Sequence, residues 1–229
     1  MSPSARPYQG ESAENRVTTR RRTLVDTGFT LMAAEGWRSV TIDSLCRRAK
    51  LNKRYFYESF ADLDAVADAV VDELAAKLLA IGLEAAHAAQ TENLATDALA
   101  RVVMKAVIGW LVGDPRRARV LFSEVSDNPR AQSHRKLVIR QLAHELSAFG
   151  HKFHEAPEPQ PIAQAGAALL IGGSIEALLS WLDGDIEMSL DEFIDAIAGF
   201  WVAVGSAAVE TATRHLKKAG SVKKSKNSF

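Results

Sequence analysis

The sequence has little cysteine: one residue, Cys46, among 229. A single thiol excludes a disulfide framework within the chain and any zinc site built from several cysteines. The N-terminus also lacks the apolar run of a secretory signal peptide. These absences are typical of a cytoplasmic protein, and cytoplasmic is the location we expect.

The chain also lacks a net charge, because 28 basic residues balance 28 acidic ones. The charges are nevertheless segregated. Residues 1–60 hold 11 basic and 6 acidic residues, residues 161–216 hold 1 and 8, and residues 217–229 hold 5 and none. The basic N-terminal part therefore suits an anionic partner, although the overall charge favours none.

Long uninterrupted apolar runs are missing too. The most apolar stretch, residues 165–182, contains Glu176 and many small residues, so we expect a buried helix rather than a membrane span, and no membrane partner. Alternating β-branched residues are also lacking, whereas apolar residues recur at helical spacing. The predicted class is all-α, with about nine helices, near residues 20–35, 42–49, 52–59, 62–88, 99–112, 117–125, 129–153, 162–182 and 190–216.

Both ends of the chain are expected to be disordered. Residues 1–18 combine Pro, Gly and polar residues, and residues 217–229 are a lysine-rich tail for which accessory DNA contact is an alternative. Between them we expect a DNA-binding domain over 19–65 and a larger helical domain over 66–216.

The sequence from residue 41 to residue 60 predicts two short helices joined by a turn. Thr41 suits the N-cap of the first helix and Asn52 the N-cap of the second, with Lys50 in the turn. This is a helix-turn-helix pattern, which presents its second helix to DNA by its N-terminus. The side chains of that first turn, Lys53, Arg54 and Tyr55, are then candidates for contacts with base edges.

At these residues the sequence resembles the DNA-binding domain of the TetR/AcrR family of bacterial transcriptional regulators. The resemblance covers about residues 20–70 and rests on Phe29, Gly36-Trp37, Val40-Thr41, Ser44-Leu45-Cys46, Leu51-Asn52 and Phe56-Tyr57-Glu58-Ser59-Phe60. It implies that Thr41, Tyr57 and Ser59 contact phosphates. It also implies that Lys53, Arg54 and Tyr55 face bases.

The sequence departs from the family pattern at two positions. Lys50 stands where the family has glycine, so either the turn is altered or the lysine charge compensates by lying over a phosphate. Leu63 stands where the family has a phosphate-binding lysine. As a hypothesis, a basic arm of Arg20, Arg21 and Arg22 replaces that contact at the DNA backbone or in the minor groove.

The resemblance implies a homodimeric repressor that binds a palindromic operator and is released by a small-molecule effector. The alternatives are an activator or a nonspecific DNA-organising protein, or a helical small-molecule-binding protein or enzyme with a vestigial helix-turn-helix. We expect no enzyme, because no nucleophile and base occur at a recognisable spacing. No cofactor is expected.

The last two long helices are rich in small residues and apolar nearly all round. Such a helix needs more than one neighbour, which favours a homodimer interface made from these helices of two chains. Burial inside a single core is the alternative.

Aromatic side chains in the larger domain are candidates for an effector pocket suited to an apolar or amphipathic molecule. The candidates are Trp110, Phe122, Phe149 and Trp181. Cys46 is expected to be a buried small hydrophobe. His144, His151 and His154 are expected to be solvated rather than metal ligands, because the spacing fixes no third ligand, and no metal is predicted.

Overall fold

A computed structural model describes residues 13–123, 133–134, 136–145 and 161–226, and every regular element within these ranges is a helix. The all-α prediction is therefore confirmed for the described part of the chain. The elements are α1 (Ala13–Glu35), η1 (Trp37–Ser39), α2 (Ile42–Ala49), α3 (Lys53–Ser59), α4 (Leu63–Thr91), α5 (Thr96–Gly113), α6 (Arg116–Ala118), η2 (Arg119–Ser123), α8 (Pro161–Asp183) and α9 (Leu190–Lys226). Residues 133–134 and 136–145 are also helical.

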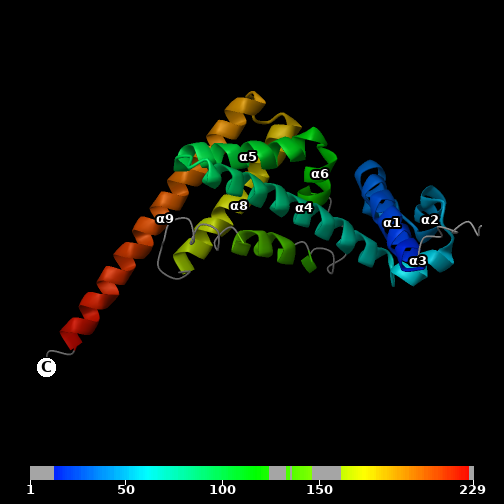
Figure 1. The fold of residues 1–229 in the computed structure, drawn as a ribbon, viewed down its shortest axis with the longest axis horizontal. Coiled ribbons are helices and arrows are strands. Elements are labelled where there is room, and N and C mark those ends of the chain that lie inside the picture. The colour runs from blue at the N-terminus through cyan, green and yellow to red at the C-terminus, as the bar shows by residue number, and fades with distance from the viewer. Residues whose placement is uncertain (1–12, 124–132, 135, 146–160, 227–229) are drawn as a thin grey trace, which may run out of the picture.

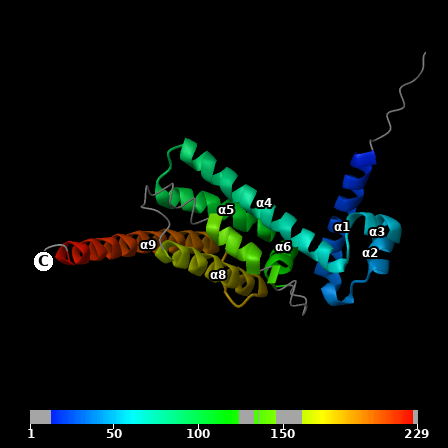
Figure 2. The same ribbon diagram turned by 90° about the horizontal axis from the view of Figure 1, so that it is seen from below.

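The helices form an elongated molecule with two parts, joined by α4 (Figure 1). The first part holds α1, α2 and α3 and lies at one end. The second part is a bundle that includes α5, α8 and α9, and the C-terminal part of α9 extends away from it at the opposite end (Figure 2). The long α4 runs from the small part into the bundle, so the two parts share one continuous helix.

The small part has its own apolar core, in which Leu24, Leu45 and Phe56 are fully buried. Helices α1 and α4 cross closely at Gly28, where an added Cβ atom would lie 2.9 Å from the Val66 Cγ1 atom. The absence of a side chain at Gly28 is thus what lets α4 pack against α1. Through this contact the small part is fixed to the start of α4.

The second core fills the bundle. Leu111 of α5, Leu121 of η2 and Phe193 of α9 are buried in it, and the Trp181 ring stacks on the Phe193 ring at a centroid distance of 5.4 Å. This core holds most of the large apolar side chains of the second part.

Two elements contribute to both cores. In α4, Val70 belongs to the first core and Val71 to the second. In η2, a π-helical turn, Val120 belongs to the first core and Leu121 to the second. A π-turn is a rare conformation that is often found at functional positions in helices. Neighbouring residues of α4 and of η2 thus pack into different cores, so these two elements connect the cores.

Two expected boundaries were wrong. Helix α1 begins at Ala13, so residues 13–18 of the expected arm are helical, and α9 continues through Lys226, so most of the expected tail is helical as well. Extending a helix that a core already holds needs little further free energy where no proline interrupts, which explains both. The sixth helix, expected near residues 117–125, is present over residues 116–123 as the short α6 followed by the π-helical η2, and residues 124–132 lie outside the described part.

Helices α8 and α9 leave much apolar surface uncovered. Their windows Gln164–Asp183 and Leu190–Thr211 have mean hydropathies of 1.6 and 1.5, and length and composition alone would let them cross a membrane. Only 11% and 22% of these windows is buried inside the chain. The expected buried helix at 165–182 is therefore wrong for the single chain, and burial in a single core does not explain these helices.

The uncovered residues recur at helical spacing and form one stripe on each helix. The α8 stripe consists of exposed Ala165, Ala168, Leu169, Gly172 and Gly173, and the α9 stripe of exposed Gly199, Phe200, Ala203, Ser206 and Ala207. Added Cβ atoms at Gly172, Gly173 or Gly199 would meet no atom of the described chain within 4 Å. The stripes are shallow apolar surfaces with room for another helix.

Candidate nucleic-acid interface

The ends of α2 and α3 are capped as the sequence predicts. Thr41 and Ser44 form a reciprocal capping box, in which the Ser44 N–H donates to Thr41 Oγ1 at 3.1 Å and the Thr41 N–H donates to Ser44 Oγ at 2.9 Å. Asn52 Oδ1 accepts from the Tyr55 N–H at 3.1 Å. These caps fix where each helix begins, and thus which side chains lie at the N-terminal tip of α3.

Lys50 occupies the turn in the left-handed conformation, with φ 54° and ψ 36°. The Leu51 N–H donates to the Cys46 carbonyl at 3.0 Å, as in a regular helix C-terminus. The turn is therefore not altered by the replacement of glycine. The lysine adopts the glycine conformation, which disfavours a residue with a Cβ atom by about 1–2 kcal/mol.

The cations at the tip of α3 lie on the surface and pair with carboxylates of the same chain. Lys53 Nζ lies 2.8 Å from Asp43 Oδ1, and this hydrogen bond raises the pKa of Lys53 above its ordinary value. Arg54 Nε lies 3.1 Å from Glu58 Oε1, and the Arg54 side chain is 83% exposed. Both cations are thus positioned by α2 or α3 and remain accessible to a partner.

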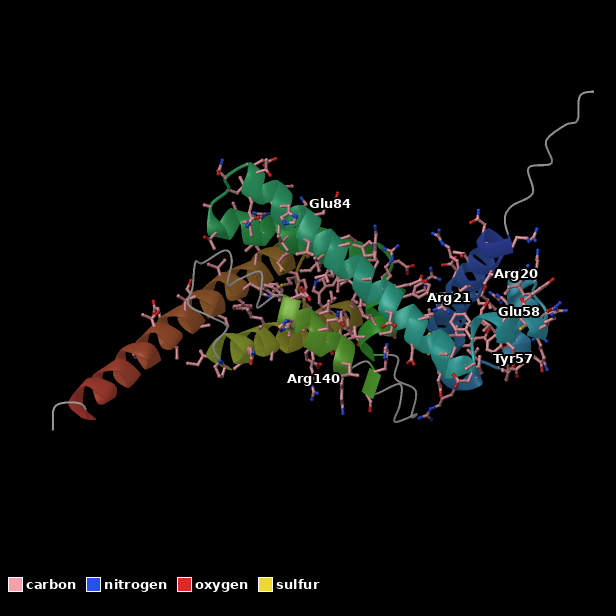
Figure 3. All side chains as sticks on the ribbon, turned by 60° about the horizontal axis from the view of Figure 1, so that its bottom comes forward. Arg20, Arg21, Tyr57, Glu58, Glu84 and Arg140 are labelled. Atoms are coloured by element: carbon pink, nitrogen blue, oxygen red, sulfur yellow. The ribbon has the colours of Figure 1, made fainter. Side chains whose placement is uncertain are left out.

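Arg20 and Arg21 do not form a free arm, contrary to the hypothesis, because both lie within α1 and pack on α3. The Arg20 guanidinium lies 3.9 Å from the centroid of the Tyr55 ring and 3.2 Å from Glu58 Oε2. Arg21 donates to the Ser59 carbonyl at 3.3 Å and lies 4.2 Å from the centroid of the Phe60 ring. Figure 3 shows Arg20, Arg21 and Glu58 gathered where α1 meets α3.

The other expected DNA contacts differ in their accessibility. Arg22 and Thr41 are exposed, the Tyr57 side chain is 59% exposed, and Ser59 is half-buried. Tyr55 is half-buried, and the Arg20 guanidinium covers one face of its ring. Leu63 packs against the first core.

Three of the four expected effector-pocket residues belong to the second core. Phe122 is buried, Trp181 donates to the Met188 carbonyl at 2.9 Å, and the Arg117 guanidinium lies 4.8 Å from the centroid of the Trp110 ring. The structure thus brings these aromatic residues into one apolar region. That they line a cavity stays a prediction. Phe149 lies outside the described residues.

Cys46 is buried, as expected, and burial raises the pKa of its thiol. A thiol that is harder to ionise is a poorer nucleophile, which fits a packing role. Among the described residues no group of three potential ligands could hold a metal ion. His144 lies within this part of the chain, whereas His151 and His154 do not.

Sequence reasoning missed the two carboxylates of the interface, Asp43 and Glu58. The Arg54–Glu58 pair could have been found, because residues four apart on a helix are neighbours. The Arg20–Glu58 and Lys53–Asp43 pairs join different helices. They could not have been found from spacing alone.

Comparison with known proteins identifies the fold. No protein-family model and no curated protein matches the sequence, but 83 chains of solved structures match it in three dimensions. A TetR family transcription regulator from Marinobacter aquaeolei has a TM-score of 0.59 at 14% identity, covering 83% of this chain and 97% of that one. The chain has the TetR-family fold.

Two further matches are regulators named FadR. FadR from Bacillus subtilis, solved with stearoyl-CoA, has a TM-score of 0.60 at 16% identity and covers 82% of this chain and 97% of that one. The fatty acid degradation regulator FadR from Bacillus halodurans has a TM-score of 0.60 at 13% identity, covering 80% and 94%. The shared fold extends over both parts of the molecule and thus beyond the helix-turn-helix.

Proposed function

We propose that the protein is a TetR-type transcriptional regulator that binds a near-palindromic DNA operator as a homodimer in the cytoplasm. We further propose that it is a repressor, released when a small molecule enters the second part. The observation that carries the proposal is the tip of α3, where a capped helix N-terminus presents Lys53 and the exposed Arg54. The TetR-family fold around this tip supports the same function.

The tip of α3 has the chemistry that DNA requires. Backbone N–H groups at a helix N-terminus favour phosphate, and an exposed arginine can bind guanine O6 and N7 with two hydrogen bonds. Thr41, Lys50, Tyr57 and Arg22 are exposed and supply groups for phosphate oxygens. In this proposal Lys53, Arg54 and Tyr55 read bases, and the surrounding residues fix the register.

The α8 and α9 stripes support the dimer. Their small residues permit close helix approach, and Leu169 and Phe200, which are 66% and 62% exposed, supply the large apolar side chains. Stripes of two chains would form a four-helix interface around a twofold axis. A second copy then covers the surface that a single chain leaves exposed, and it places two α3 tips on one side of the DNA.

The contact between the two cores supports release by an effector. A ligand changes DNA affinity only if it binds the DNA-bound and DNA-free shapes unequally. Because α4 and η2 have residues in both cores, a ligand that displaces side chains of the second core can move the first part. An apolar or amphipathic effector suits the aromatic side chains there, and Bacillus subtilis FadR was solved with an amphipathic molecule, stearoyl-CoA.

The DNA-binding proposal is tested by selecting duplexes from a randomised library with the purified protein. We expect enrichment of a twofold-symmetric sequence, and Arg54→Ala should weaken binding to it by roughly fivefold or more. The matched control is Arg140→Ala, an exposed arginine far from α3 (Figure 3), which should bind as the wild type does. Equal binding by the Arg54→Ala protein would refute the assignment of α3 as the reading helix.

The effector proposal is tested by thermal melting with a long-chain acyl-CoA, free coenzyme A and a fatty acid. A ligand at 100 times its Kd stabilises the folded state by about 2.7 kcal/mol, which is a clear rise in Tm. We expect the acyl-CoA or the fatty acid to raise Tm and to release selected DNA, and free coenzyme A to do neither. Binding of free coenzyme A alone would contradict the proposed apolar or amphipathic class.

A further inference from the structure

Glu58 of α3 contacts two arginines, Arg20 of α1 and Arg54, the arginine proposed to read a base. One carboxylate oxygen, Oε1, lies 3.1 Å from Arg54 Nε, and the other, Oε2, lies 3.2 Å from Arg20 Nη1. The Glu58 side chain is 37% exposed and that of Arg20 only 23%. A single carboxylate thus links the scaffold helix α1 to the most exposed cation at the tip of α3.

The scaffold side of this link is well fixed. The Arg20 guanidinium lies over the Tyr55 ring at 3.9 Å, while Arg21 donates to the Ser59 carbonyl and lies over the Phe60 ring. Tyr55 and Ser59 flank Glu58 on the same helix. Arg20 is therefore held between α1 and α3, and its contact restricts the rotamers of Glu58.

The DNA side of the link determines which donors Arg54 can offer. A guanidinium carries five N–H donors, and one of these, on Nε, is taken by Glu58. The four donors on Nη1 and Nη2 remain, and two of them, one on each nitrogen, point past the end of the side chain. That arrangement suits an end-on, two-bond contact with guanine O6 and N7.

We propose that Glu58 is a positioning residue for base recognition, which holds Arg54 by Nε so that its two terminal nitrogens read one guanine in each half-site. This role rests on the proposed DNA-binding function. Glu58 itself touches no base, and its negative charge opposes nonspecific attraction to phosphates. The carboxylate thereby lowers affinity for random DNA while it raises discrimination at one base pair.

Variants at position 58 separate positioning from charge. Glu58→Ala removes both contacts and the charge, whereas Glu58→Gln removes the charge but keeps an amide oxygen that can accept from Arg54 Nε. Asp43→Ala is the matched control, because it removes a carboxylate beside the same helix tip, from Lys53 instead of Arg54. A role through charge alone would make the two Glu58 variants behave alike.

The experiment measures Kd for the duplex selected by the wild type and for duplexes with each base pair replaced. Arg54→Ala identifies the guanine that Arg54 reads. We expect Glu58→Ala to lower discrimination at that same position by roughly fivefold, Glu58→Gln to restore part of it, and Asp43→Ala to leave it unchanged. All three carboxylate variants should bind random DNA more tightly than the wild type does.

Several results would overturn the role of Glu58. If Glu58→Ala discriminates as well as the wild type, or if Glu58→Ala and Glu58→Gln lose discrimination equally, Glu58 does not position Arg54. The same conclusion follows if Arg54→Ala discriminates as well as the wild type. The two Glu58 results leave the proposed function standing if the wild type still selects one sequence, whereas unaltered discrimination by Arg54→Ala also removes Arg54 from base reading. A wild type that selects no sequence refutes both proposals. Melting curves check that each variant is folded. If Glu58→Ala does not fold, the comparison of Glu58→Gln with the wild type still tests the role of Glu58.

Discussion

The two surfaces at opposite parts of this molecule differ in how far the chain satisfies them by itself. At the tip of α3, Lys53 and Arg54 both have carboxylate partners in the same chain. On the α8 and α9 stripes, Leu169 and Phe200 are exposed by 66% and 62%. At the first surface the cations already have carboxylate partners, and these exposed ion pairs can be exchanged for contacts with DNA, as the proposed function requires. The second is left uncovered by the described residues, and we propose that a second copy of the chain buries it.

The difference predicts opposite responses to salt. Phosphate contacts release counterions, so DNA affinity should fall steeply as salt rises. Apolar contacts between α8 and α9 stripes are not weakened by screening. Raising salt should therefore separate protein from DNA and leave the dimer intact, as size-exclusion chromatography with light scattering can show.

The largest expected effect comes from a charge on the α9 stripe. Phe200→Glu should raise the Kd of the dimer by at least about 30-fold, because a central aromatic contact contributes about 2 kcal/mol or more and the carboxylate would be buried. Operator affinity should fall with it, since one half-site remains per molecule. Light scattering reads the change directly.

The control for that variant is Val102→Glu, which places the same charge at an exposed apolar position of α5. It should remain dimeric. If Phe200→Glu also remains dimeric, the α9 stripe is not the interface. Recovery of the wild-type protein only with detergent or vesicles would instead indicate that a membrane covers the two stripes.

The close packing of α1 against α4 at Gly28 can be tested by its effect on the stability of the single chain. Gly28→Ala should lower the free energy of unfolding by about 1–3 kcal/mol, because its Cβ atom would lie 2.9 Å from Val66 Cγ1. Gly109→Ala is the matched helical control, with nothing within 4 Å of its Cβ atom. It should raise stability by about 0.5–1 kcal/mol. Urea unfolding of both variants checks the sign of each change.

Lys50, in the turn before α3, carries both a strained backbone and a positive charge, and the effects of the two can be measured separately. Lys50→Gly should stabilise the protein by up to about 1 kcal/mol, since glycine adopts the left-handed conformation without a steric penalty. If the lysine also contacts a phosphate, the same change should reduce the slope of log affinity against log salt by about 1.8 for the dimer, about 0.9 for each protomer. An unchanged slope would show that Lys50 contacts no phosphate, and backbone strain would then be its only effect.

The smallest predicted effect concerns Asp114, which lies between α5 and α6. Its carboxylate accepts hydrogen bonds from the Arg116 side chain, and these lower its pKa below the ordinary value. A lowered folded-state pKa gives stability that is present at neutral pH and lost as pH falls through that pKa, below about 4. Asp114→Asn should therefore remove part of the loss of stability at acid pH. The expected change in the free energy of unfolding is less than about 1 kcal/mol, and Tm measured as a function of pH checks it.

Local sequence signals were enough to predict the caps and the turn of the helix-turn-helix. Thr41, Asn52 and Lys50 act on residues within four positions of themselves, so their roles can be inferred from spacing. The positions of Arg20 and Arg21 against α3 could not, because these contacts span 38 residues of sequence and depend on how α1 packs.

The ends of the helices show a different limit of sequence reasoning. Polar composition near Ala13 and lysines near Lys226 suggested disorder, yet a helix continues through each segment because packing elsewhere had already nucleated it. The aromatic residues Trp110, Phe122 and Trp181 were correctly expected in the larger domain. Their neighbours depend on tertiary packing, which periodicity does not give.

In the proposed function, two α3 tips of a dimer read one operator together. A hydroxyl-radical footprint of the wild-type protein on the duplex it selects tests this directly. We predict two protected half-sites related by twofold symmetry, with centres separated by about 34–36 Å or a multiple of one helical turn. A single asymmetric protected segment, or uniform protection without sequence preference, would contradict it.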